Sequence, residues 1–162
     1  MEYNTDKYEH GYIPIYEEIF EKLRNKELRL LEIGVFEGES LKMWREFFLK
    51  GKIVGVEIDP KRCSNIEGCE VINADATKYF QGSAGPRDII IDDGSHKFED
   101  ILASFNLLWP SLNPGGVYVI EDIYGSNDTS QVIDVMVDKH KAIFGKEFKS
   151  IELRNQLLIL KK

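Results

Sequence analysis

The stretch that decides the fold reads Ile89-Ile90-Ile91-Asp92-Asp93-Gly94-Ser95-His96, and a second stretch, Tyr118-Val119-Ile120-Glu121-Asp122, shares its pattern. Each begins as a short apolar run and ends in acidic residues. A near-continuous apolar run is typical of a strand that is buried on both faces of a parallel sheet. Ligands of such sheets bind just beyond the carboxyl ends of the strands. The acidic residues therefore fall where a ligand site is expected.

Strands and helices alternate along the rest of the chain. Further apolar strands are expected at residues 28–35, 52–58 and 70–74, and apolar side chains with helical spacing lie at 12–25, 40–49, 98–108 and 129–144. A short helix is also expected through Tyr79 and Phe80, and Asn113-Pro114-Gly115-Gly116 predicts a turn. Residues 147–153 and 156–160 flank Arg154-Asn155, a pattern typical of a β-hairpin.

Strand–helix units closed by a hairpin predict a Rossmann-like, doubly wound α/β fold. Its sheet is expected to have seven strands, mostly parallel, with the C-terminal hairpin antiparallel. No internal repeat or low-complexity linker divides the sequence. We therefore expect a single domain over residues 1–162.

The composition restricts the partners that the chain can bind. The 162 residues are 43% hydrophobic and 30% charged, with a formal net charge of -7. This charge argues against a nucleic acid or an anionic membrane, because both are bound by concentrated lysine and arginine. We see no signal peptide and no apolar run near the ~20 residues that cross a bilayer. Cys63 and Cys69 match no zinc-site spacing, so two free thiols in a cytoplasmic protein are expected, with a disulfide as the open alternative.

The first half of the chain carries the marks of a nucleotide-type site. The first strand runs into Gly34 and then into a helix at about Glu39-Ser40, where backbone N–H groups are unpaired. Alone this pattern is weak, because the Gly-x-Gly-x-x-Gly spacing of dinucleotide-binding proteins is missing. Glu57 ends the second strand, where a carboxylate can bind both hydroxyls of a ribose. Asp75 follows the third strand, where a carboxylate can accept a hydrogen bond from an adenine amine.

The order of these features resembles the class I S-adenosylmethionine-dependent methyltransferases. Together with Thr5-Asp6-Lys7, Ser40-Leu41-Lys42-Met43-Trp44 and the two acidic stretches, it is similar to the metal-dependent sugar O-methyltransferases of macrolide antibiotic biosynthesis. The resemblance runs from Thr5 to about Ile123. It implies S-adenosyl-L-methionine and Mg²⁺ as cofactors. The cofactor-binding residues that we expect are Thr5, Glu32, Gly34, Ser40, Glu57, Asp75, Ala76 and Asp92. Asp92 could instead support a metal ligand from behind.

The same resemblance implies that Asp93, Glu121 and Asp122 bind the magnesium ion and that His96 is the general base. The chemistry of the residues agrees. Three carboxylates suit Mg²⁺, which takes oxygen ligands and leaves positions for water or for a diol. A histidine has a pKa of ~6.5 and is suited to accept a proton near neutral pH. Asp93 would thus serve both the metal and the catalytic step.

Other interpretations of these residues stay open at this point. Asp92-Asp93-Gly94-Ser95 could be a turn that caps the following helix, and Glu121-Asp122 could be a solvated strand end. His10 is expected at the surface. The aromatic side chains of Trp44 and Trp109 are expected in the core.

The function expected from the sequence is an S-adenosylmethionine- and Mg²⁺-dependent O-methyltransferase that acts on a hydroxyl of a sugar or a similar diol. A catechol-type O-methyltransferase would use much the same metal chemistry on an aromatic diol. A cofactor-binding module without catalysis is a further alternative, whereas the glycine spacing disfavours a nicotinamide-dependent oxidoreductase. The expected partner is a small-molecule acceptor, and the chain could form a homo-oligomer.

Overall fold

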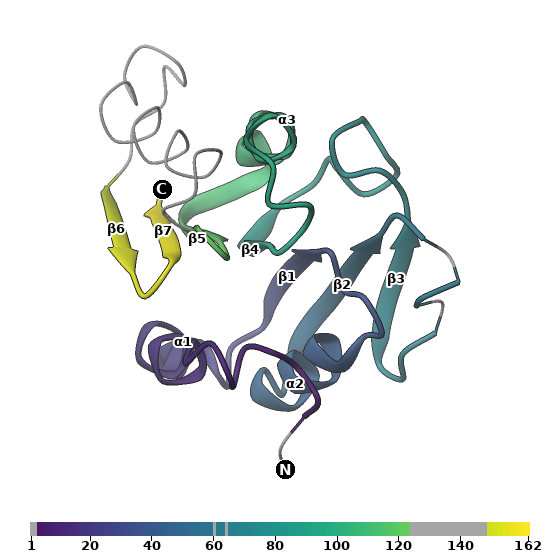
Figure 1. Cartoon of the computed structure of the whole chain (residues 1–162). Helices are drawn as coiled ribbons and strands as arrows, with labels where there is room; N and C mark the ends of the chain where they lie inside the picture. The colour runs from purple at the N-terminus through teal and green to yellow at the C-terminus, as the bar shows by residue number, and fades with distance from the viewer. Residues whose placement is uncertain (1–2, 60, 64, 124–148) are drawn as a thin grey trace.

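The computed structural model describes residues 3–59, 61–63, 65–123 and 149–162, and their strands form one sheet (Figure 1). The order across the sheet is β3-β2-β1-β4-β5-β7-β6. The strands are β1 (Leu28–Ile33), β2 (Gly51–Glu57), β3 (Cys69–Asn73), β4 (Arg87–Asp92), β5 (Leu112–Ile120), β6 (Ser150–Arg154) and β7 (Leu157–Lys161). Neighbours among β1 to β5 pair in parallel, whereas β7 is antiparallel to β5 and to β6. The predicted fold class is confirmed.

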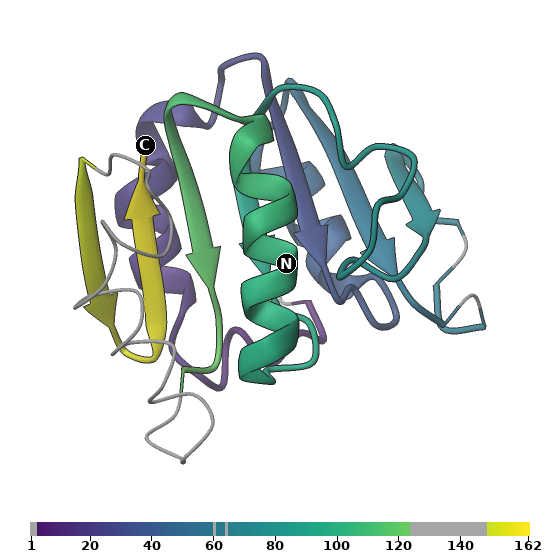
Figure 2. The same cartoon turned by 90° about the horizontal axis from the view of Figure 1, so that it is seen from above.

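Helices cover both faces of this sheet (Figures 1 and 2). The α-helices α1 (Ile13–Phe20) and α2 (Glu39–Phe47) lie on one face, and α3 (Phe98–Leu108) lies on the other. Along β4, Ile89 and Ile91 pack into the core on the side of α1 and α2, whereas Ile90 packs into the core on the side of α3. Burial on both faces explains why the sequence of β4 is continuously apolar. Trp44 and Trp109 are buried in these cores, as predicted.

Two local predictions differ from the structure. The helix expected through Tyr79 and Phe80 is wrong, because residues 74–86 form turns and bends. Asp75 accepts a hydrogen bond from the Thr77 backbone N–H, and this tight turn replaces a first helical turn. The turn expected at residues 113–116 lies within β5, which begins at Leu112. The predicted helix at 129–144 falls outside the described residues.

The C-terminal hairpin turns at Asn155 and Gln156, one residue later than predicted. Both have positive φ, 44° and 68°, as a two-residue type I′ turn requires. The Asn155 side-chain amide donates to the His10 carbonyl at 2.7 Å, and the Ile123 N–H donates to the Gln156 carbonyl at 2.9 Å. The hairpin therefore ties the N-terminal segment to the end of β5. Among the described helices, none is long and apolar enough to cross a membrane.

Candidate active site

A cleft of about 1220 Å³ lies beyond the carboxyl ends of the parallel strands. Thr5 from the N-terminal segment lines it together with the loops that follow β1 to β4. Nine of the predicted site residues line it: Thr5, Gly34, Ser40, Glu57, Asp75, Ala76, Asp92, Asp93 and His96. Glu32, Glu121 and Asp122 are buried next to it. The structure therefore brings the predicted residues to one edge of the sheet, as parallel strands require.

At one end of the cleft, two carboxylates are fixed by hydrogen bonds from backbone N–H groups. Glu57 accepts hydrogen bonds from the Phe36 N–H at 2.9 Å and from the Asp59 N–H at 3.0 Å. Asp75 Oδ1 accepts from the Thr77 N–H at 3.0 Å and from the Thr77 hydroxyl at 2.6 Å. Hydrogen bonds from Lys78 and Thr77 lower the pKa of Asp75 to about 2. Both side chains are thus held in fixed orientations, and Asp75 is held as an anion.

Gly34 lies between this end of the cleft and the loop after β4. Its φ is +78°, and a Cβ atom there would stand 2.0 Å from the Asp93 carbonyl oxygen. Glycine is therefore required by the close approach of the two loops as well as by the backbone conformation. This packing brings the β1 loop against the β4 loop and so joins the two ends of the cleft.

Asp92 and Glu32 are both buried, and each is satisfied by hydrogen-bond donors from the fold. Asp92 accepts from the hydroxyls of Ser104 and Tyr118. Burial raises the pKa of Asp92 to about 6. Glu32 accepts from Ser40 Oγ at 2.7 Å and from Trp44 Nε1 at 3.1 Å. Because Glu32 does not line the cleft, its predicted contact with a cofactor stays a prediction.

At the other end of the cleft, Lys7 lies at the centre of a group of carboxylates. Its ammonium nitrogen is 2.6 Å from Asp93 Oδ2, 2.9 Å from both Glu121 carboxylate oxygens and 3.3 Å from Glu32 Oε1. The side chain is only 1% exposed. Burial alone would lower the pKa of Lys7, but the negative charges of Glu121, Asp93 and Glu32 outweigh burial and hold this pKa well above its usual range. Lys7 is therefore a buried cation among carboxylates.

The α1 region supplies further donors to the acidic pair at the end of β5. The Tyr16 hydroxyl donates to Glu121 Oε1 at 2.6 Å, and the Tyr12 hydroxyl donates to Asp122 Oδ1 at 2.5 Å. Glu121 is 1% exposed and Asp122 is 6% exposed. The interpretation of this pair as a solvated strand end is therefore wrong.

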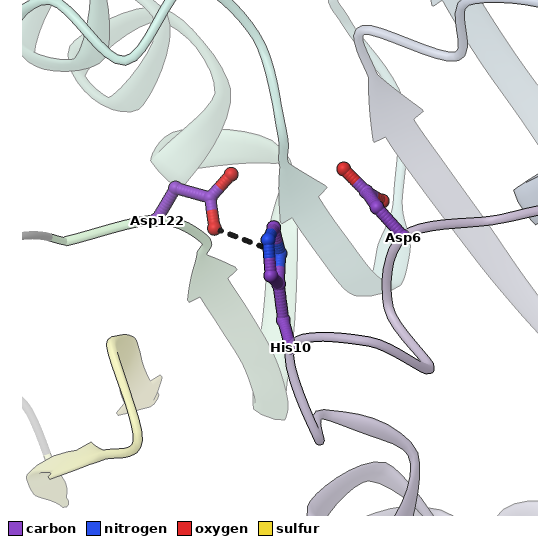
Figure 3. Close-up of side chains that lie close together, drawn as sticks. All are labelled: Asp6, His10 and Asp122. Atoms are coloured by element: carbon purple, nitrogen blue, oxygen red, sulfur yellow. Dashed lines mark ion pairs between the residues drawn. The ribbon is translucent and has the colours of Figure 1, made fainter.

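His10 also belongs to this end, where the structure places it partly at the surface. Its Nδ1 atom is 3.5 Å from Asp122 Oδ1, and Figure 3 shows the imidazole between Asp122 and Asp6. About one third of the side chain is exposed. The Asn155 side chain, in the turn between β6 and β7, donates to the His10 carbonyl and so helps to fix this residue.

His96 approaches the same carboxylates from the loop after β4. Its Nε2 atom is 3.6 Å from Asp122 Oδ2 and 3.9 Å from Asp93 Oδ1. His96 and Asp122 both have a φ of +57°, in the left-handed region that side chains other than glycine rarely adopt. Such strained residues cluster at functional sites. Before helix α3, the Ser95 hydroxyl accepts a hydrogen bond from the Lys97 N–H at 3.3 Å, as in a turn at the start of a helix. The carboxylates of Asp92 and Asp93 have other partners, Ser104 and Tyr118 for Asp92 and Lys7 for Asp93.

The ligand atoms near Asp93 form two groups suited to a cation. Asp93, His96 and Asp122 offer atoms that all lie within 4.8 Å of one another, and so do Glu32, Asp93 and Glu121. The second group surrounds Lys7. Of the predicted metal ligands, Asp93 and Asp122 thus meet beside the cleft, whereas Glu121 lies on the side of Lys7. The carboxylate oxygens of both groups suit a hard divalent cation.

The sequence did not identify Lys7, Tyr12 or Tyr16 as site residues. Lys7 stood in a stretch that carried the family resemblance, but no role was given to it. The four-residue spacing of Tyr12 and Tyr16 places both hydroxyls on one side of the α1 region. This spacing, together with the lysine and the histidine that precede it, was the only sign in the sequence that these residues belong to a site. It does not reveal which carboxylates accept hydrogen bonds from the two hydroxyls.

A profile of the family described as "Methyltransferase domain" matches residues 31–123, which hold β1 to β5 and the acidic residues at their ends. The chain belongs to this methyltransferase family. Among its relatives are the demethylmacrocin O-methyltransferase of Streptomyces fradiae, 38% identical over 127 residues, and the mycinamicin VI 2''-O-methyltransferase of Micromonospora griseorubida, 39% identical over 132 residues. Each match covers 71% of this chain and 32% of the relative. This methyltransferase chain thus spans about a third of the length of those relatives.

A solved structure with the same fold is that of the methyltransferase MycE from the mycinamycin biosynthetic pathway, in complex with Mg and SAH. It superposes with a TM-score of 0.77 at 28% identity, over 93% of this methyltransferase chain and 49% of MycE. A further structure of MycE also holds mycinamycin VI. The likeness therefore extends across almost all of the present chain.

Proposed function

We propose that this methyltransferase chain transfers a methyl group from S-adenosylmethionine to a hydroxyl of a sugar or a similar diol, with a divalent cation, Mg²⁺, and with His96 as the general base. One observation carries the proposal. A single cleft has two fixed carboxylates at the ends of β2 and β3, and beyond the ends of β4 and β5 it meets a group of carboxylates with a histidine. The first set suits a nucleoside, and the second suits a metal-bound diol.

The cofactor end is suited to the adenosine part of the cofactor. Glu57 keeps lone pairs toward the cleft beside its two backbone donors and can accept from both ribose hydroxyls. Asp75 stays ionised and can accept from the adenine amine. When bound, S-adenosylmethionine would supply the methyl group from a positively charged sulfur. Asp92, buried at the wall between the two ends, faces the region where that charge would lie.

At the cation end, Asp93 and Asp122 would hold the metal from the side of the cleft, and Glu121 would complete the set. A bound divalent cation would orient two hydroxyls of the acceptor and lower the pKa of one of them. Glu121 has both oxygens within hydrogen-bond distance of Lys7. We therefore expect its contribution to metal affinity to be smaller than that of Asp93.

His96 would take the proton that the acceptor hydroxyl loses as its oxygen gains the methyl group. Asp93 and Asp122 lie close to Nε2 and would stabilise the imidazolium that forms. The main contribution of the chain would be to orient the two reactants, and His96 would accept one proton from the acceptor hydroxyl.

The acceptor class is inferred from the relatives. The demethylmacrocin and mycinamicin VI enzymes are named as O-methyltransferases, and the same reaction on a related sugar is proposed here. A catechol-type acceptor remains the second candidate, because an aromatic diol would meet the same group of Asp93, His96 and Asp122. A single domain over the whole chain, a cytoplasmic location, a homo-oligomer and the absence of a nucleic-acid partner stay predictions.

Binding and turnover measured on the same protein would test the proposal. With S-adenosylhomocysteine at ~100 times its dissociation constant, stability should rise by about 2.7 kcal/mol. Sugar and catechol acceptors are then screened for methyl transfer with Mg²⁺ and with EDTA. Activity that requires Mg²⁺ and falls by ~10³-fold or more in Asp93→Asn is expected, since metal stabilisation amounts to several kcal/mol.

Glu70→Gln is the matched control, because Glu70 is an exposed carboxylate that pairs with Lys52 outside the cleft. Cofactor binding without any methyl transfer would favour the non-catalytic module. No stabilisation by S-adenosylhomocysteine would remove the methyltransferase proposal altogether.

A further inference from the structure

Two cation positions share the carboxylate of Asp93. The outer position lies between Asp93 and Asp122, next to the cleft, and the imidazole of His96, the proposed base, stands beside it. The inner position lies between Glu32, Asp93 and Glu121. Glu32 and Glu121 are 0% and 1% exposed, so the inner position is closed to solvent.

The inner position already holds a cation, the Lys7 ammonium. Its nitrogen lies between 2.6 and 3.3 Å from oxygens of all three carboxylates. The same three side chains gather around no other ammonium or guanidinium group in the described part of the chain. An ammonium donates three hydrogen bonds, which matches three carboxylate partners. Of the three carboxylates, Asp93 is the one that also lines the cleft, so a second cation can approach it from the outer side.

We propose that Lys7 acts as a built-in substitute for a metal ion: it fills the inner cation position of what would otherwise be a two-metal site, and so limits the chain to one divalent cation, at the outer position. The inference rests on the proposed metal dependence of the site. It assigns Lys7 as a positioning residue, because its ammonium holds Asp93 and Glu121 at a fixed spacing.

Geometry supports this assignment over a direct competition between Lys7 and the metal. Lys7 contacts Asp93 through Oδ2, whereas Oδ1 is the oxygen that is 3.9 Å from His96. The two oxygens of one carboxylate therefore face the two positions, as in sites where a carboxylate bridges two metal ions. Tyr16 further fixes Glu121 on the inner side.

The test is to count the divalent ions bound by the full chain with and without the ammonium. Mn²⁺ binding is measured by isothermal titration and by electron paramagnetic resonance for the wild type, for Lys7→Ala and for Lys52→Ala. The control lysine, Lys52, is exposed and pairs with Glu70 outside the cleft. We expect one Mn²⁺ per chain in the wild type and in Lys52→Ala, and two in Lys7→Ala with a spin-coupled signal.

The outcomes separate this inference from the proposed function. One Mn²⁺ in Lys7→Ala would overturn the inference, because Lys7 and the metal would then use a single position. No Mn²⁺ in the wild type would overturn the metal-dependent function itself. If Lys7→Ala unfolds in EDTA, its folding is followed by circular dichroism as Mn²⁺ is added. Recovery of the native signal supports replacement of the ammonium by a metal ion, and an unfolded chain at saturating Mn²⁺ contradicts it.

Discussion

The two ends of the cleft hold their carboxylates in different ways. At the cofactor end, Glu57 and Asp75 accept from backbone N–H groups that are two residues away at Asp59 and Thr77, and 21 residues away at Phe36. At the cation end, Asp93 and Glu121 accept from Lys7, which is 86 and 114 residues away along the chain. At the cofactor end, two of these three backbone donors lie in the same turn as the carboxylate that they contact, whereas both carboxylates at the cation end depend on a tertiary contact.

This difference has an electrostatic reason. Asp75 is partly exposed, so water and a short turn suffice to stabilise its charge. Glu121 is buried, and burial raises its pKa well above the usual range, so its carboxyl group needs charged or hydrogen-bonding partners. A short loop has too few donors for several buried carboxylates at once. The chain therefore brings an ammonium and two phenol groups from its N-terminal segment.

The largest effect is expected at the cation end from His96→Ala. Loss of the general base should lower kcat by ~10²–10⁴-fold while cofactor affinity is kept. His10→Ala is the matched variant, because His10 also lies beside Asp122 but outside the lining of the cleft. A smaller loss of kcat is expected in His10→Ala. Turnover with saturating Mg²⁺ and acceptor checks both, and equal losses would remove the distinction between the two imidazoles.

Tyr16→Phe tests the buried donors of the same end with a smaller expected effect. Removal of its hydroxyl leaves Glu121 Oε1 without the bond that now measures 2.6 Å. A metal affinity lower by ~10–100-fold is expected, as is typical when the partner of a ligand is lost. The free energy of unfolding should fall by about 1–3 kcal/mol.

Urea unfolding and Mg²⁺ titration check these effects of Tyr16→Phe. Tyr12→Phe removes the equivalent bond to Asp122 and serves as the comparison, with an effect of the same order. An unchanged Mg²⁺ titration in both variants would mean that the phenols serve stability alone.

The sequence predicted those parts of the site that depend on strand order. Asp92 and Asp93 lie at the end of β4, and Glu57 lies at the end of β2, because apolar runs define strands and parallel strands share an edge. The partners of Glu121 could not be predicted, because nothing local specifies a lysine 114 residues away. The contact of His10 with Asp122 could not be predicted for the same reason. The helix at Tyr79 failed because apolar spacing was given more weight than the turn-forming tendency of Asp75.

Asp75→Asn should have the smallest effect and tests the cofactor end. The amide oxygen can still accept from Thr77, so the turn is kept, but the negative charge that would accept from the adenine amine is lost. A loss of about 1 kcal/mol, or roughly fivefold in S-adenosylhomocysteine affinity, is expected by isothermal titration. Stability should hardly change, because the Lys78 pair is exposed. Glu27→Gln, at an exposed position outside the cleft, is the control.

The pH dependence of the same interaction gives a sharper test. The pKa of Asp75 is lowered to about 2, so its carboxylate stays ionised well below neutral pH. A lowered pKa means that any stability from this charge is present above the unfolded value of ~3.9 and is lost only as the pH falls toward 2. The affinity ratio of wild type to Asp75→Asn should therefore be constant between pH 5 and 8. A ratio that falls toward pH 5 would show that the carboxylate is not held by Thr77 and Lys78 as the structure places it.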